Sequence, residues 1–258
     1  MKKGLGIFTL VILLIVGAVW YFLNGAGDFI RAQIEQQGSQ YLGTEVSVGK
    51  VDLALTEGKM TLSALAIDNP KDFSNQNAFS VDSITLDLGE SIKEPYVVQN
   101  ISINAPQVLY EVDSEGQGNL VVIKNNLVAN LPKTNNPTTE SQGVNPLLIV
   151  ENVTVSNVQL KLNFEAFSTG DLDIKTKAYE VTLPTFNAGA IGQPNGMPAD
   201  QVGAAVVNAM LDNVIAAAKA QAKKRLAEEA KKKVNEELDK QKDKLLEKAN
   251  DKLKDLLN

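Results

Sequence analysis

The stretch "VSVGKVDLAL", residues 46–55, has the alternation of apolar and polar residues that is typical of a half-buried β-strand, except that the alternation changes phase once. The two valines before the glycine share one face of such a strand, whereas the three apolar residues after the lysine have the opposite parity. "VTVSNVQLKL", residues 153–162, places its five apolar residues at the same five positions, and residues 60–67 and 79–88 also change phase. A β-bulge, one extra residue that bends a strand, produces this pattern. Because several strands carry it, we predict a curved and bulged, mostly antiparallel sheet.

The predicted β domain occupies residues 45–187, which we interpret as a succession of strands. Gly58 indicates a tight hairpin turn between the first two strands. Residues 130–146 are rich in Pro and Asn and have no apolar periodicity, so they predict a loop between two β segments. The two segments are either divergent copies of one unit or independent parts of one sheet.

The N-terminal segment predicts a membrane anchor. After the tip "MKKG", residues 1–4, come nineteen residues without a charge, residues 5–23, which as a helix span about 28 Å. This length matches the hydrocarbon core of a bilayer. The two lysines of the tip indicate that it lies in the cytoplasm and that the remaining chain lies on the far side. A cleaved signal peptide is the alternative, although the residues after the apolar run offer no good cleavage site.

Two further helices are predicted, one on each side of the β domain. Residues 28–42 have an apolar face and Asp28 as N-cap, so we expect an amphipathic helix that packs on the β domain. Residues 198–258 contain no proline after the first position and a single glycine, so they predict a long C-terminal helix. Its first half has a broad apolar stripe, whereas residues 219–258 are rich in Lys and Glu and keep a thin apolar line. The thin line is typical of a coiled coil or of a helix on a partner surface; a solvated tail is the alternative.

The composition excludes most kinds of catalytic site. The chain has no histidine and no cysteine, and therefore lacks the commonest general base, a thiolate nucleophile and the commonest metal ligands. Asp171 and Asp173 lie two apart in an expected strand and are expected to face solvent. The acidic turn at residues 113–119 does not have the ligand spacing of a calcium loop. We therefore expect no enzymatic activity, no cofactor and no metal site.

The charge is distributed unevenly along the chain. Residues 219–258 carry 13 Lys or Arg and 9 Asp or Glu, a net charge of +4, whereas residues 1–218 have a net charge of −10. An acidic body repels phosphate, and the mixed charges of the tail attract it only weakly. We therefore expect no nucleic-acid partner.

The motifs of the first half of the chain follow one another in a recognisable order. They are the anchor, a variant of G-x-x-V-x-V-x-x-V from residue 43, a strand that ends in Asn69 and Pro70, and a P-x-V-x-Y-E element that contains Pro106, Tyr110 and Glu111. In this order they resemble the N-terminal region of the AsmA family of bacterial envelope proteins. Larger AsmA-like proteins are related in fold to the chorein-type lipid transporters, whose curved sheets form long grooves that shield acyl chains.

The resemblance implies a single-pass bacterial inner-membrane protein with a cytoplasmic N-terminus, most of its chain in the periplasm and an AsmA-like groove. This chain is short, so only a short section of such a groove is expected. The implied function is to bind phospholipid acyl chains or help move them in envelope and outer-membrane biogenesis. The candidates for groove lining or adjacent core are Leu53, Leu55, Leu62, Ile67, Ile84 and Leu86.

Two alternatives stay open at this point. In one, helices cover both faces of the sheet and no groove exists. In the other, which the Lys- and Glu-rich helix suggests, the chain is a membrane-anchored scaffold that recruits a protein partner, or self-associates, through residues 219–258, with the β domain as a spacer.

Overall fold

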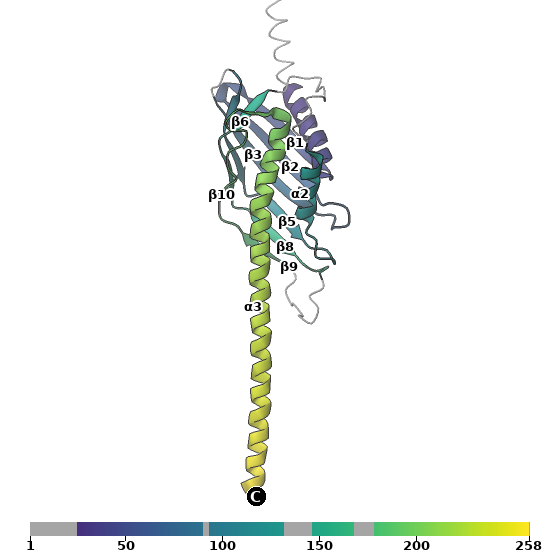
Figure 1. Cartoon of the computed structure of the whole chain (residues 1–258), viewed down its shortest axis with the longest axis vertical. Helices are drawn as coiled ribbons and strands as arrows, with labels where there is room; N and C mark the ends of the chain where they lie inside the picture. Colours follow the sequence, from purple (N-terminus) through teal and green to yellow (C-terminus); the bar gives the residue numbers. More distant parts are fainter. Residues whose placement is uncertain (1–24, 90–92, 132–145, 168–177, 258) are drawn as a thin grey trace, which may run out of the picture.

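The computed structural model describes residues 25–89, 93–131, 146–167 and 178–257, most of which form one curved sheet with helices packed against it (Figure 1). The chain begins this fold with a helix over residues 25–42. The strands are β1 (Val46–Ala54), β2 (Lys59–Asp68), β3 (Asn77–Leu88), β4 (Tyr96–Asn104), β5 (Gln107–Glu111), β6 (Leu147–Val150), β7 (Val153–Ser156), β8 (Gln159–Asn163), β9 (Ala178–Thr182), β10 (Phe186–Asn187) and β11 (Met197–Pro198). A 3-10 turn, η1 (Leu55–Glu57), joins β1 to β2, and the later helices are α2 (Asn119–Asn130) and α3 (Ala199–Leu257). The α+β class, the curved sheet and the long C-terminal helix are confirmed.

The eleven strands form a mixed sheet. β1 to β4 pair antiparallel in chain order, and β3 also pairs antiparallel with β5. After α2 the chain adds three parallel pairings, of β6 and β7 with β4 and of β8 with β5. β9, β10 and β11 then return antiparallel on β8, β7 and β6. Antiparallel pairing predominates as expected, and the parallel pairs are possible because the connection from β5 onward includes a helix.

A single row of residues crosses the sheet at the place where the strands change phase. Val48 pairs with Leu65 and Lys50 pairs with Ser63, so the register of β1 and β2 is the same on both sides of this row. The other neighbouring strands also keep their register across it. We call this the kink row, and all of its members are exposed: Gly49, Ala64, Asp82, Ala105, Asn157 and Pro184.

The kink row corrects the predicted bulges. No strand gains a residue over its neighbour at this level, because the additional residue lies in the same row throughout, within β1, β2 and β3 and between β4 and β5, β7 and β8, and β9 and β10. The register shifts lie instead at Ile67/Asp68 and Asp87/Leu88. Three members, Ala64, Ala105 and Asn157, have a left-handed backbone with φ of 53°, 51° and 55°. The sheet therefore bends as a whole, and the apolar residues on both sides of the row face the same interior. The shared row accounts for the repeated sequence pattern without an internal duplication.

The helix over residues 25–42 covers the edge of the sheet at β1, as predicted for residues 28–42. The backbone N–H groups of Val46 and Val48 donate to Ser39 Oγ and Glu35 Oε1, both over 2.9 Å. Gly27 lies against the carbonyl oxygen of Val51, where a Cβ atom would overlap it. An uncovered edge strand can pair with other chains, so this helix closes a surface prone to aggregation.

Helix α2 lies where we predicted a strand. Leu120, Ile123 and Leu127 are spaced by three and four residues and are buried on one side of the helix. The prediction was wrong because the valines that follow Leu120 are β-branched and favour strands by propensity, whereas packing on one face decides the outcome. Asn126 Nδ2 donates to the carbonyl oxygen of Leu42, which joins α2 to the helix over residues 25–42.

The first part of α3 crosses the interior side of the sheet. It buries Val206, Met210, Val214 and Ala218, and Asp212 forms an ion pair with Lys124 of α2. Among the described residues, α3 is the one helix long and apolar enough to cross a membrane by length and composition. We interpret it as a core helix, because its apolar side chains pack on the sheet. The predicted tip and anchor, residues 1–4 and 5–23, lie outside the described residues.

Candidate functional site

The predicted groove residues belong to the hydrophobic core or lie beside it. Leu62 and Ile84 pair across β2 and β3, both buried, whereas Ile67 lies on the other side of the kink row and pairs with Phe79. Leu53 and Leu86 are partly buried. Leu55 lies in η1, and the structure does not describe its side chain. The sheet therefore divides the five candidates that lie on its strands between its two halves, with Ile67 alone in one of them.

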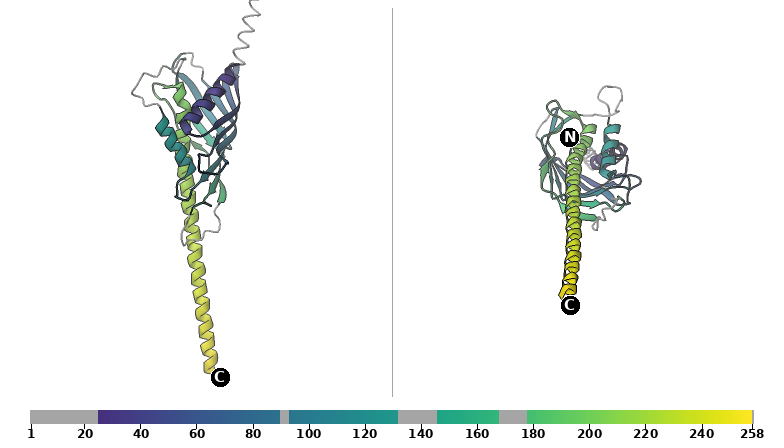
Figure 2. Two further views of the ribbon diagram at one scale, coloured as in Figure 1. Left: turned by 90° about the vertical axis from the view of Figure 1, so that its right-hand side faces the viewer. Right: turned by 60° about the horizontal axis from the view of Figure 1, so that its bottom comes forward.

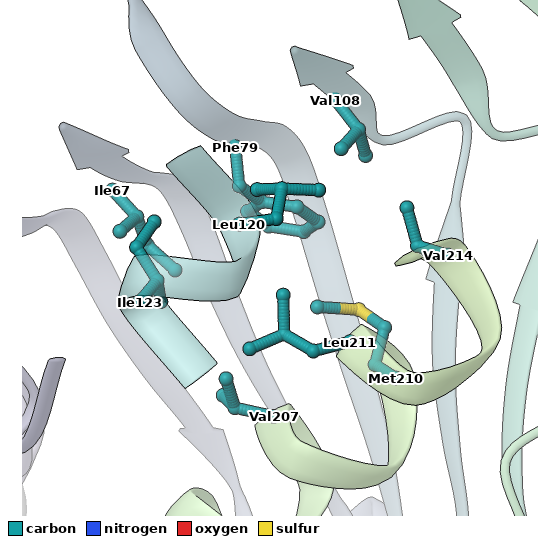
Figure 3. Close-up of a pocket in the computed structure, with 9 residues that line it drawn as sticks. All are labelled: Ile67, Phe79, Val108, Leu120, Ile123, Val207, Met210, Leu211 and Val214. Carbon is teal, nitrogen blue, oxygen red and sulfur yellow. The ribbon is translucent and has the colours of Figure 1, made fainter. Parts of the chain in front are cut away.

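Helices α2 and α3 close the interior over the half that contains Ile67. Apolar side chains from β2, β3, β5, α2 and α3 surround a cavity of about 20 Å³ (Figure 3). The lining residues are Ile67, Phe79, Val108, Leu120, Ile123, Val207, Met210, Leu211 and Val214. A space of this size holds about one water molecule, so an acyl chain has no room here while both helices are in place. In this half of the sheet the helices occupy the expected groove.

An apolar row in the other half is less completely covered. Leu53 pairs with Met60, Met60 pairs with Leu86, and Leu86 pairs with Ile101. The first three residues are partly buried, whereas Ile101 is 5% exposed. The side chains of this row are therefore less buried in β1, β2 and β3 than in β4. We call Leu53, Met60 and Leu86 the open row.

A polar cluster joins β2, β5 and α2 and contains two of the family-motif residues. Asn69 Nδ2 donates to Glu111 Oε2 over 2.9 Å, and Ser74 donates to the same oxygen through its hydroxyl over 2.7 Å and its N–H over 3.2 Å. Asn119 Nδ2 donates to Asn69 Oδ1 over 2.7 Å. We call Asn69, Ser74, Glu111 and Asn119 the polar latch. It holds the β2–β3 connection against the start of α2, which is a structural role.

Asn119, which is 0% exposed, was not predicted from the sequence. Its Nδ2 donates to the Leu109 carbonyl oxygen over 2.8 Å, and its Oδ1 accepts from the N–H groups of Glu111 over 2.9 Å and Leu120 over 2.8 Å. The side-chain amide therefore pairs with β5 as a neighbouring strand would. No signal in the sequence distinguishes this asparagine from the other polar residues around it.

The other family-motif residues support the same region. Pro70 and Pro106 are buried, and Tyr110 is 5% exposed. Burial raises the pKa of the Tyr110 phenol above its ordinary value, so the ring stays neutral in the core. These residues are therefore packing residues of the fold.

Helix α3 continues beyond the domain as an arm. The Arg225 guanidinium is 5.0 Å from the centre of the Tyr179 ring, and residues 228–230 are the last partly buried ones among those whose side chains are described. From residue 231 to residue 247 every side chain is exposed. We call residues 231–257 the arm, which at about 1.5 Å per residue extends about 40 Å from the domain (Figure 2).

Three of the four large apolar side chains that are exposed on the described part of the arm lie on one side of the helix, whereas the fourth, Leu246, lies about 80–120° away around the axis. Val234 is 60% exposed, Leu238 49% and Leu245 67%. At 100° per residue they fall within about 40° of one another around the axis. Some charged side chains of the arm pair with one another within the helix, as Lys240 does with Glu237.

The described residues offer little for catalysis. They contain no group of three acidic side chains that approach one another as metal ligands do. In the acidic turn, Asp113 Oδ1 accepts from the N–H groups of Glu115 and Gln117, so it closes the turn itself. Asp171 and Asp173, and residues 132–145 of the expected loop, lie outside the described residues.

The chain was compared with protein-family models, curated proteins and solved structures. None of them matches it. The resemblance to the AsmA family is therefore carried by the sequence motifs alone and stays a hypothesis.

Proposed function

We propose that this chain is a membrane-anchored scaffold whose β domain holds α3 and whose arm binds a protein partner. The observation that carries the proposal is the arm itself, a helix with exposed side chains from residue 231 to residue 247 and with Val234, Leu238 and Leu245 on one side. These side chains do not contribute to the core of the domain. Burying one of them fully in an interface contributes about 1.5–3 kcal/mol.

The spacing on the arm supports a helical partner. Val234, Leu238, Gln241 and Leu245 are separated by four, three and four residues, which is the spacing of a coiled-coil seam. Ion pairs within the arm, such as Lys240 with Glu237, favour the helix before a partner binds. The partner is an amphipathic helix, either of another protein or of a second copy of this chain.

We also propose a location in the bacterial inner membrane, with the N-terminus in the cytoplasm and the domain in the periplasm. The support is the uncharged run over residues 5–23, the lysines before it and the resemblance to AsmA proteins.

The experiment compares partners crosslinked to the full chain and to a chain that ends at Ala230, which keeps Arg225 on Tyr179. We expect the truncated chain to lose the partner. A full-length variant with Val234, Leu238 and Leu245 replaced by serine should lose it too. The matched control replaces Lys232, Asp239 and Asp243, on the other side of the arm, by serine and should keep it. An unchanged set of partners after truncation contradicts the proposal.

A second candidate function is the binding of phospholipid acyl chains, and the open row favours it. Leu53, Met60 and Leu86 form a continuous apolar strip across β1, β2 and β3, and their side chains are only partly buried. An acyl chain that lies on this strip removes apolar surface from water without displacing α2. This candidate does not need the arm.

The test for this candidate measures phospholipid that copurifies with the full chain by mass spectrometry. Met60→Lys should reduce the bound lipid several-fold. Val128→Lys is the matched control, because Val128 is 57% exposed on α2 and is not part of the open row. Equal amounts of lipid on the two variants contradict acyl-chain binding at this strip.

A further inference from the structure

One end of the domain lies next to the predicted anchor. The described part of the chain begins at Gly25, which is already helical and lies two residues after the end of the predicted anchor at residue 23. Gly27 packs on Val51, three residues before the end of β1, so the start of this helix lies near the β1–β2 turn. Figure 2 shows this helix starting at the same end of the domain as α3. We call it the proximal end.

The β3–β4 connection and the start of α3 also belong to the proximal end. The Leu88 N–H donates to the Gly58 carbonyl oxygen over 2.7 Å, which joins β3 to the β1–β2 turn. Tyr96, the first residue of β4, pairs with Leu148 of β6, which in turn pairs with Met197 just before α3.

The two exposed aromatic side chains of the described part of the chain both lie at this end. Phe29 is 66% exposed on the helix over residues 25–42, and Tyr96 is 39% exposed. The remaining large exposed apolar residues are aliphatic and lie on α2 and α3. Aromatic rings are the side chains that favour the interface between a bilayer and water.

The short connection brings Phe29 close to the bilayer surface. Four residues separate it from Asn24, and the helix rises about 6 Å from Gly25 to Phe29. Side chains of a helix lean toward its N-terminus, so the Phe29 ring points back toward the anchor. The headgroup region is about 5–8 Å thick on each side of the hydrocarbon core. The ring therefore reaches the headgroups unless the domain turns away.

We propose that the proximal end is a membrane-contact surface that seats the domain end-on on the lipid headgroups through Phe29 and Tyr96. This inference rests on the membrane anchor of the proposed function. Exposed charges of both signs lie near this end, Asp28 and Glu57 as well as Lys59, so the surface fits zwitterionic lipid and does not depend on anionic lipid.

End-on seating sets the direction of α3. The helix starts at the proximal end and has 59 residues, so its C-terminal end lies about 90 Å away along its axis. The arm is then the part of the chain farthest from the membrane. A partner of the arm would be met well away from the lipid surface.

The experiment measures quenching of a single tryptophan by brominated lipid. Trp20, the one tryptophan of the chain, is replaced by phenylalanine, and a new tryptophan is placed at residue 29, 96 or 128. The full chain is reconstituted into phosphatidylcholine vesicles that contain phosphatidylcholine brominated near the headgroup end of its acyl chains. Phe29→Trp and Tyr96→Trp should lose most of their fluorescence and shift to shorter wavelength, whereas Val128→Trp, on the side of the domain, should not.

Two other outcomes overturn the proposal. Quenching at all three positions means that the domain lies on its side. No quenching in a chain that still floats with the vesicles means that the domain stands off the membrane, and it leaves the anchor of the proposed function intact. A chain that does not float with the vesicles contradicts the anchor and, with it, the seating.

Discussion

Asn119→Ala should destabilise the protein more than the loss of one small side chain suggests. The Asn119 side chain is fully buried and bonds four groups, two of which belong to β5: the Leu109 carbonyl oxygen and the Glu111 N–H. The backbone pairing of β3 with β5 involves only Val108 and Gln107. Beyond that point the Asn119 amide takes the place of a neighbouring strand.

The expected magnitude follows from those two backbone groups. In the alanine variant they lose their partner inside the core, and each such group costs about 1–3 kcal/mol. The total is about 2–6 kcal/mol, which is a large part of the 5–15 kcal/mol that stabilises a typical domain. The corresponding fall in the unfolding temperature is roughly 5–20 °C.

Calorimetry of the full chain in detergent measures this effect, with Asn125→Ala as the matched control. Asn125 lies on the same helix but is exposed, so alanine there should be neutral or should stabilise by up to about 0.7 kcal/mol through helix propensity. An unfolding temperature of Asn119→Ala within 2 °C of that of the control would refute the reasoning.

Three further predictions concern the kink row, the core tyrosine and the helix at the sheet edge. Ala64→Gly and Ala105→Gly should each change the free energy of unfolding by no more than about 1 kcal/mol, because relief of the left-handed backbone strain offsets the larger conformational entropy that glycine loses on folding. Ala64→Val should lower the free energy of unfolding by more than about 1 kcal/mol. A valine variant as stable as the unchanged protein in denaturant unfolding would contradict this. Burial raises the pKa of the Tyr110 phenol above its ordinary 10.0, so the contribution of the neutral phenol to folding stability should be fully present below pH 10 and be lost as the pH rises through the higher pKa of the folded state. Tyr110→Phe should weaken this alkaline loss of stability in unfolding curves, and an unchanged pH dependence would argue against it. Gly27→Val should push the first helix off β1, since even a Cβ atom overlaps the Val51 carbonyl oxygen; hydrogen exchange at the amides of β1 should rise, and unchanged protection there would show that the contact is dispensable.

The sequence predicted the curvature of the sheet because the phase changes are a local property. The spacing of Val46, Val48 and Val51 predicts that the inward-facing positions change parity between Val48 and Val51, and all three side chains are buried. It did not show that the change occurs at one level in every strand, because register depends on pairing between distant segments. Only the structure aligns Gly49 with Ala64 and Asn157.

Most of the site was beyond prediction for a similar reason. The apolar positions Leu62 and Ile84 read correctly as interior, but whether helices or lipid cover them depends on where α2 and α3 dock. Helix α2 itself was not predicted, because its β-branched residues favour strands by propensity, whereas packing of one helix face on the core favours the helix. The role of Asn119 could not be predicted, because most of its hydrogen-bond partners lie in segments that only the fold brings together. The arm was predictable, because its charge pattern is local.

The central claim is that one side of the arm is a binding surface. Site-specific photocrosslinking of the full chain in cells tests it most directly, with the probe placed at Leu238, at Leu245 or at Asp243 on the opposite side of the same helix. We expect the same crosslinked species from probes at Leu238 and Leu245 and none from a probe at Asp243. Equal crosslinking from both sides of the arm, or no crosslink from either leucine, would contradict it.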